Sequence, residues 1–122
     1  MPHKVMLFDD DETMVSLLQT LLELEGYQVV LPATTGRLET LIDNIFREKP
    51  ALLLLDVHLN HINGLDLLRC LRQSSELNSI HVLMTSGMDL SHECCMEEAD
   101  GFLMKPYMAE DLMIKIKNVL GT

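Results

Sequence analysis

Four acidic residues stand side by side in the segment MLFDDDETM, directly behind an apolar run: Asp9, Asp10, Asp11 and Glu12. Like charges this close repel each other by about 1 kcal/mol per pair in bulk water, and by several times that near a protein surface. A chain that keeps such a group where a buried segment ends therefore favours a cation at this place.

Three further positions carry chemically useful side chains directly behind apolar segments. Asp56 follows LLLL, the pair Thr85 and Ser86 follows HVLM, and Lys105 follows FLM. Carboxylate oxygens suit a hard ion such as Mg²⁺, which is commonly held by one or two carboxylates, water and phosphate. With an ammonium and a hydroxyl added, the set predicts a pocket for a phosphoryl group, in which a carboxylate can become an aspartyl phosphate.

Strands and helices that alternate along the chain must position these residues. Short apolar runs predict strands at 5–8, 27–31, 51–55, 80–85 and 102–104. Apolar residues at helical spacing predict helices over 13–24, 36–48, 65–73, 89–98 and 109–120. Gly26 is expected to stop the first helix, and residues 56–63 are expected to form a loop.

This alternation predicts the α/β fold class, with a parallel sheet, right-handed crossovers and helices on both faces. In open sheets of this class the ligand site lies beyond the carboxyl ends of the strands. Asp9, Asp10 and Asp56 are therefore expected to converge on one edge, close to Lys105. The three carboxylates could not all stay ionised there without a compensating cation.

The composition narrows the function classes. A length of 122 residues fits one domain, so a single domain over 1–122 is expected. Nine Lys and Arg against nineteen Asp and Glu give a net charge of −10, which argues against direct nucleic-acid binding. Three cysteines without metal-ligand spacing indicate reduced thiols. With no signal-peptide pattern, and with 51–55 as the longest apolar run, we expect a cytoplasmic chain without a membrane partner.

Four segments in succession resemble the signature segments of response-regulator receiver domains, the phosphoacceptor modules of two-component signalling. They are KVMLFDDDETM, ALLLLDVHLNHINGLDLL, IHVLMTSGM and ADGFLMKPYMAEDL. The resemblance runs from Lys4 to about Leu120, nearly the whole chain. It implies a flavodoxin-like, doubly wound fold in which a five-stranded parallel sheet of order 2-1-3-4-5 is flanked by five helices.

The resemblance also implies roles for the residues at the strand ends. Asp56 matches the phosphorylated aspartate, Asp10 the acid that coordinates Mg²⁺ directly, and Asp9 its neighbour that acts through water. The backbone carbonyl of His58 matches the third protein ligand of the metal, for which Mn²⁺ is the expected substitute.

The phosphoryl group itself is expected to meet Lys105, and the Lys105–Pro106 bond is expected to be cis. Ser86 matches the hydroxyl that moves to the phosphate, with Thr85 as the alternative. Phe102 matches the aromatic residue that turns inward when the hydroxyl moves.

As partners, the resemblance implies a sensor histidine kinase or a phosphotransfer protein that donates the phosphoryl group from a phosphohistidine. The face formed by the fourth helix, the fifth strand and the last helix would then control an output domain or a downstream protein. A homodimer on phosphorylation is a further expectation, with Asp100 and Lys115 at positions where winged-helix regulators often make an ion pair. Such a domain catalyses its own phosphorylation and dephosphorylation without being a conventional enzyme.

Other interpretations stay open at this level. Asp9 and Asp10 could merely cap the helix that follows them. A phosphohydrolase of the haloacid-dehalogenase type would need a second acid two residues after its nucleophile, where this chain has His58 behind Asp56. A flavodoxin would need a phosphate loop rich in Ser, Thr and Gly after the first strand, where this chain has DDDET. A receiver that acts only as a binding module would not need the retained site residues.

Overall fold

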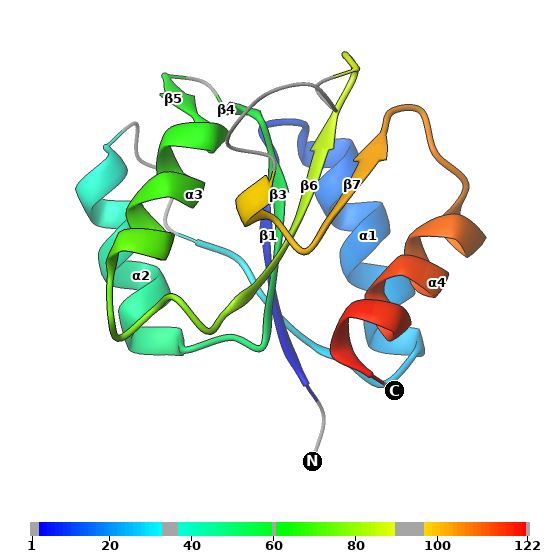
Figure 1. The fold of residues 1–122 in the computed structure, drawn as a ribbon. Helices are drawn as coiled ribbons and strands as arrows, with labels where there is room; N and C mark the ends of the chain where they lie inside the picture. Colours follow the sequence, from blue (N-terminus) through cyan, green and yellow to red (C-terminus); the bar gives the residue numbers. More distant parts are fainter. Residues whose placement is uncertain (1–2, 33–36, 60, 90–96, 122) are drawn as a thin grey trace.

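The computed structural model describes residues 3–32, 37–59, 61–89 and 97–121, and Figure 1 shows the path of the chain. Within these ranges the elements follow in the order β1 (Lys4–Phe8), α1 (Glu12–Leu24), β2 (Gln28–Val30), α2 (Leu38–Glu48), β3 (Leu52–Asp56), β4 (His58–Leu59), β5 (Ile62–Asn63), α3 (Gly64–Gln73), β6 (His81–Ser86), β7 (Gly101–Met104) and α4 (Ala109–Leu120). Among the described residues, none of the helices combines the length and hydropathy that a bilayer span requires.

Five of the strands form one parallel sheet in the order β2-β1-β3-β6-β7. Counted along the chain without the short β4 and β5, this is the order 2-1-3-4-5, so the predicted fold class and strand order are confirmed. The central strand β3 is buried along its whole length, because helices cover both faces of the sheet and its sequence offers leucine to each of them.

The segment after β3 differs from the expected loop. β4 and β5 pair antiparallel as a second, two-stranded sheet, with His58 opposite Asn63 and Leu59 opposite Ile62. Leu59 and Ile62 are partly buried against the hydrophobic core that covers the α3 side of the sheet, and this contact favours a hairpin over an open loop. The structure has four α-helices within the described ranges; most of the helix predicted over 89–98 lies outside them.

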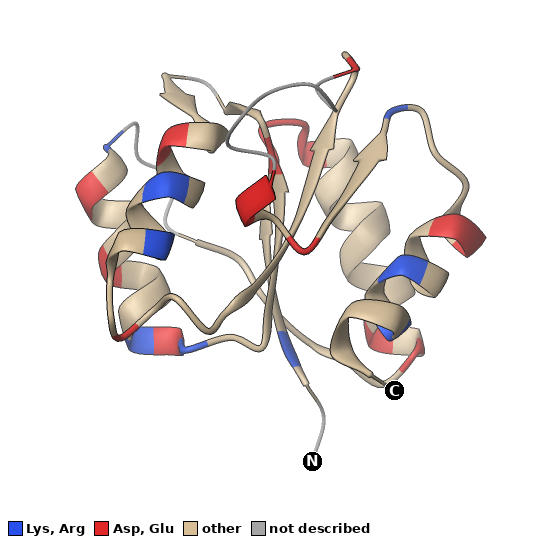
Figure 2. Ribbon diagram, viewed as in Figure 1, with Lys and Arg blue, Asp and Glu red and all other residues tan. Residues whose placement is uncertain are grey.

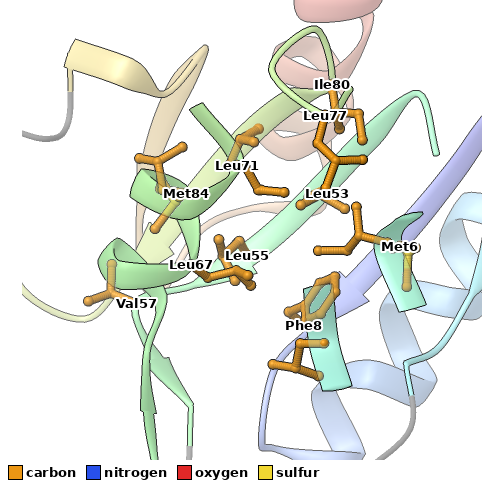
Figure 3. Close-up of a cluster of buried hydrophobic side chains, with 14 residues drawn as sticks. Met6, Phe8, Leu53, Leu55, Val57, Leu67, Leu71, Leu77, Ile80 and Met84 are labelled. Atoms are coloured by element: carbon orange, nitrogen blue, oxygen red, sulfur yellow. The ribbon is translucent and has the colours of Figure 1, made fainter. Parts of the chain in front are cut away.

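Two hydrophobic cores lie on opposite faces of the sheet, because successive side chains of a strand point to opposite sides. One core joins the sheet to α2 and α3 and includes Met6, Leu53, Leu67 and Met84, as Figure 3 shows. The other joins it to α1 and α4 through a second set: Val5, Leu7, Leu18, Leu22, Leu52, Leu54, Leu83, Leu112 and Ile116. This packing fixes the strands, and with them the positions of the residues that follow their carboxyl ends.

Arg72, in the last turn of α3, connects that helix to the segments that precede β6 and β7. Its guanidinium donates to the carbonyls of Asn78 (3.1 Å) and Ile80 (2.8 Å) before β6, and to that of Glu98 (2.7 Å) before β7. It also pairs with Asp100, whose Oδ2 lies 3.1 Å from the guanidinium and accepts from the backbone N–H of Val82.

Candidate functional site

The carboxyl ends of β1, β3, β6 and β7 meet at one edge of the sheet, opposite the edge where the described chain begins and ends (Figure 1). Acidic residues gather on the turn between β1 and α1, and a basic residue stands directly after β7 (Figure 2). The predicted site residues therefore reach this edge from four strands.

The ammonium of Lys105 joins two of the carboxylates. Its Nζ lies 2.8 Å from Oδ2 of Asp9 and 2.9 Å from Oδ2 of Asp56, and both contacts are partly buried. The side chains of Asp9 and Asp56 are only 6 % and 7 % exposed, so solvent screens these pairs far less than it screens a surface ion pair.

The pKa of Lys105 reflects this setting. Burial by itself would lower it, but the hydrogen bonds to Asp9 and Asp56 and the charges of both carboxylates outweigh burial and raise the pKa well above the ordinary value of 10.5. Lys105 is therefore fully charged at neutral pH and acts as a fixed cation at the end of β7.

Three carboxylates are close enough to share a metal ion. Asp9, Asp10 and Asp56 each offer an oxygen, and these three atoms all lie within 4.8 Å of one another. An octahedral Mg²⁺ holds its ligands at about 2.1 Å, which puts opposite ligand atoms about 4.2 Å apart. The donor set and its spacing thus fit Mg²⁺ after small adjustments.

The acidic run divides into two functions. Asp11 is the N-cap of α1, and its Oδ1 accepts from the backbone N–H groups of Thr13 (3.0 Å) and Met14 (3.2 Å). Glu12 is exposed in the first turn, where the helix dipole favours an acid. Asp11 therefore caps the helix, whereas Asp9 and Asp10 lie with Asp56 at the carboxyl ends of the strands.

Asp56 is held firmly at the end of β3. Its Oδ1 accepts from the backbone N–H of His58 at 3.1 Å, which leaves Oδ2 for Lys105. Gly64, the first residue of α3, packs against the backbone of Asp56 and Val57, and its N–H donates to the carbonyl of Val57 at 2.6 Å. A Cβ at Gly64 would collide with the carbonyl oxygen of Asp56.

Both candidate hydroxyl residues lie at the end of β6 and are buried. The Oγ of Ser86 accepts from the backbone N–H of Met88 at 3.1 Å, and the carbonyl of Ser86 accepts from the N–H of Lys105 at 2.7 Å. Thr85 stands beside Asp56 in the sheet register, and its carbonyl accepts from the N–H of Val57 at 2.9 Å. Both residues remain candidates on this geometry.

Phe102 and Pro106 lie on either side of Lys105 in the sequence. Phe102, in β7, is partly buried and packs against the core that joins the sheet to α2 and α3. The Lys105–Pro106 peptide bond is cis. Met108 is the N-cap of α4 and makes no side-chain capping hydrogen bond.

Three residues make contacts that the sequence did not predict. The close approach of Gly64 to Asp56 depends on the tertiary fold. Tyr107 was not singled out from the sequence, and its hydroxyl is buried without a hydrogen-bond partner. Asp100 was considered for an ion pair between protomers, whereas its carboxylate is engaged within the chain by Arg72 and His81.

The sequence is similar to those of known regulatory proteins. Residues 5–117 match the family model of the response regulator receiver domain. The chain is 35% identical over 119 residues to the transcriptional regulatory protein CpxR of Escherichia coli strain K12, an alignment that covers 97% of this chain and 49% of that protein. The chain spans about half the length of the curated relatives it matches.

Solved structures show the same fold. A response regulator receiver domain protein from Methanospirillum hungatei superimposes with a TM-score of 0.86 at 27% identity, covering 99% of this chain and 95% of that one. The response regulator TrrA from Thermotoga maritima, solved in a complex with Mg²⁺ and BeF, superimposes with a TM-score of 0.83 at 22% identity, covering 98% of this chain and 99% of that one.

Proposed function

The chain belongs to the response regulator receiver domain family, and from this membership we propose that Asp56 accepts a phosphoryl group from a phosphohistidine. The donor would be a sensor histidine kinase or a phosphotransfer protein. The observation that carries the assignment is the arrangement of Lys105, which brings one ammonium within hydrogen-bond distance of both Asp9 and Asp56 at the carboxyl edge of the sheet.

The transfer needs one nucleophilic oxygen, and Asp56 offers one. Its Oδ2 would attack phosphorus, and the bond from phosphorus to the donor's imidazole nitrogen would break with its electron pair staying on that nitrogen. The imidazole would leave as a neutral ring, which keeps the proton already on its other nitrogen. Because the N–H of His58 already holds Oδ1, the carboxylate presents Oδ2 in a fixed direction. Lys105 would donate to the phosphoryl oxygens once they arrive, where its ammonium stabilises the charge that develops.

The metal requirement rests on Asp9, Asp10 and Asp56, whose oxygens fit Mg²⁺, with Mn²⁺ as the substitute. When bound, the ion would neutralise the phosphoryl oxygens and hold them in line for attack. Both oxygens of Asp9 already accept hydrogen bonds, from the N–H of Asp11 at 2.9 Å and from Lys105. This supports contact through water for Asp9 and direct contact for the more exposed Asp10, with the carbonyl of His58 as third protein ligand.

Phosphorylation would be sensed at the end of β6. We assign the switch to Ser86, whose hydroxyl is buried and would leave the N–H of Met88 for a phosphoryl oxygen. Phe102 would then turn inward and reshape the face formed by the segment between β6 and β7, by β7 and by α4. An output domain, a downstream protein or a second copy of the chain would read this face.

The same site would release its phosphoryl group by hydrolysis, so the domain would catalyse its own phosphorylation and dephosphorylation. We propose that it does so in the cytoplasm, as one receiver unit over 1–122. The curated relatives that it matches are transcriptional regulatory proteins about twice as long as this chain. We propose by analogy that the domain controls transcription through an output domain.

Intact-mass spectrometry tests the proposal. After incubation with phosphoramidate and Mg²⁺, the wild type is expected to gain ~80 Da, the mass of one phosphoryl group, and Asp56→Asn to gain nothing. Equal labelling of Glu12→Gln serves as a control for the loss of one negative charge close by. An unlabelled wild type under these conditions would contradict the proposal.

A further inference from the structure

Tyr107 carries a polar group that the proposed reaction leaves unused. Its ring packs against the core that joins the sheet to α1 and α4, and its hydroxyl oxygen is buried. Within the described ranges, this is the one buried side-chain nitrogen or oxygen without a hydrogen-bond partner. Buried hydroxyls nearly always find partners, so an orphaned one at the edge of a functional site calls for an explanation.

The hydroxyl lies within the electrostatic reach of the site. Burial raises the pKa of Tyr107 above its ordinary value of 10.0, the charge of Lys105 lowers it, and the charges of Asp9 and Asp56 raise it further. The same three residues form the ion-paired centre of the site. Tyr107 also follows Lys105 by only two residues, in the segment between β7 and α4.

Occupation of the metal site would change what Lys105 can bind. Its ammonium now donates to Oδ2 of Asp9 and Oδ2 of Asp56, and Mg²⁺ would draw on the same carboxylates. Two cations on one pair of carboxylates repel each other, which pushes the flexible ammonium towards another acceptor. Lys105 is only partly exposed, so a nearby buried acceptor would spare its ammonium a move into solvent.

We propose that Tyr107 is a positioning residue, whose hydroxyl oxygen accepts a hydrogen bond from the Lys105 ammonium when Mg²⁺ occupies the carboxylates. This role rests on the metal site of the proposed function. It keeps the ammonium in the pocket between the binding of the metal and the arrival of the phosphoryl group. The hydroxyl is thus unpartnered in one state of the site and bonded in the other.

The two tyrosines of the chain, and its lack of tryptophan, make the proposal directly measurable. In the Tyr27→Phe variant, Tyr107 is the only tyrosine, and Mg²⁺ is expected to shift its near-ultraviolet absorption band. In Tyr107→Phe, the remaining Tyr27 packs against the same core, and its absorption band is expected not to shift when Mg²⁺ is added. Adding Lys105→Met to Tyr27→Phe is expected to abolish the shift, because the donor is then gone.

Calorimetric titration with Mg²⁺ provides the second readout. Tyr107→Phe is expected to bind Mg²⁺ about fivefold more weakly than the wild type, as fits the loss of one hydrogen bond. Tyr27→Phe should bind like the wild type. A purely structural role for the ring would change the unfolding temperature of either variant and leave the affinity for Mg²⁺ alone.

Three results would overturn the role of Tyr107. One is an unchanged Tyr107 spectrum while calorimetry shows Mg²⁺ bound. Another is a shift that persists in Lys105→Met, and the third is equal Mg²⁺ affinity of Tyr107→Phe and Tyr27→Phe. If calorimetry shows no Mg²⁺ binding to the wild type, the metal site of the proposed function fails, and the role of Tyr107 fails with it.

Discussion

The Nζ atom of Lys105 lies 2.9 Å from Oδ2 of Asp56, a residue 49 positions earlier in the chain. The same nitrogen lies 2.8 Å from Asp9, so one cation holds two buried carboxylates together at the end of the sheet. This arrangement orders the site before any ligand arrives. It also means that a metal ion and a phosphoryl group must each take over contacts that Lys105 makes now.

Mg²⁺ is expected to stabilise the folded protein by mass action, because only the folded chain brings Asp9, Asp10 and Asp56 together. At about a hundred times its Kd, the ion should add about 2.7 kcal/mol to the free energy of unfolding. Thermal unfolding with increasing Mg²⁺ measures the effect, and Asp10→Asn should remove most of it. Glu12→Gln, which deletes a neighbouring charge outside the cluster, should respond like the wild type; a Tm indifferent to millimolar Mg²⁺ would count against the site.

Lys105→Met is expected to cost about 1–3 kcal/mol of stability without Mg²⁺, since Asp9 and Asp56 then face each other unpaired. Because folding raises the pKa of Lys105 above 10.5, its stabilising contribution is fully present below about pH 10. The contribution falls as the pH rises from 10.5 towards the folded-state pKa, because the unfolded chain loses its proton first. Urea unfolding of the wild type and of Lys105→Met from pH 7 to pH 11 should therefore give a constant difference in the free energy of unfolding, which narrows only at the alkaline end. A gap that is widest at pH 11 would contradict this pairing.

Gly64→Ala is expected to disturb the end of β3. The added Cβ would collide with the carbonyl oxygen of Asp56 and lie 2.9 Å from the Cα of Val57, and backbone cannot move aside cheaply. We expect a loss of about 1–3 kcal/mol and slower labelling by phosphoramidate. Gly87→Ala is the matched control, because a Cβ there meets nothing within 4 Å. Equal effects of the two substitutions would show that the contact with Asp56 is not the cause.

Arg72→Ala is expected to destabilise the fold by about 2–4 kcal/mol, because Asp100 and three backbone carbonyls lose their donor. Arg72→Lys should recover only part of this, since an ammonium cannot fork between them. Arg69→Ala on the same helix is the control: its side chain is 53% exposed and lies 3.5 Å from Asp66, so the cost should stay within about 0.5 kcal/mol. Denaturant unfolding compares the three, and similar losses for Arg72→Ala and Arg69→Ala would contradict the account.

The sheet was predictable from short-range pattern. Four leucines followed by Asp56 are typical of a strand buried on both faces with a polar residue at its end, and the other strands show the same pattern more weakly. The convergence of Asp9, Asp56 and Lys105 then follows from parallel topology, in which all carboxyl ends meet at one edge. Pattern and topology together were enough to predict that these three side chains lie close together.

Contacts that depend on side-chain reach were not predictable. The sequence indicated that Asp11 belongs to the start of α1 and that Asp9 lies close to Lys105, but not that one ammonium would bond Asp9 and Asp56 together. Strands of two residues, such as β4 and β5, are too short to show a period. The hydrogen bonds of Arg72 go largely to backbone carbonyls, and since every residue has one, the sequence does not show which of them Arg72 binds.

The central claim is that Asp56 carries the phosphoryl group, and borohydride trapping tests it most directly. Sodium borohydride reduces an aspartyl phosphate to homoserine, which lowers the residue mass by roughly 14 Da. After treatment with phosphoramidate and Mg²⁺, peptide mass spectrometry should find this loss at Asp56 alone, and chelation of Mg²⁺ should abolish it. Homoserine at Asp9 or Asp10, or at no position of a protein that demonstrably binds Mg²⁺, would contradict the account.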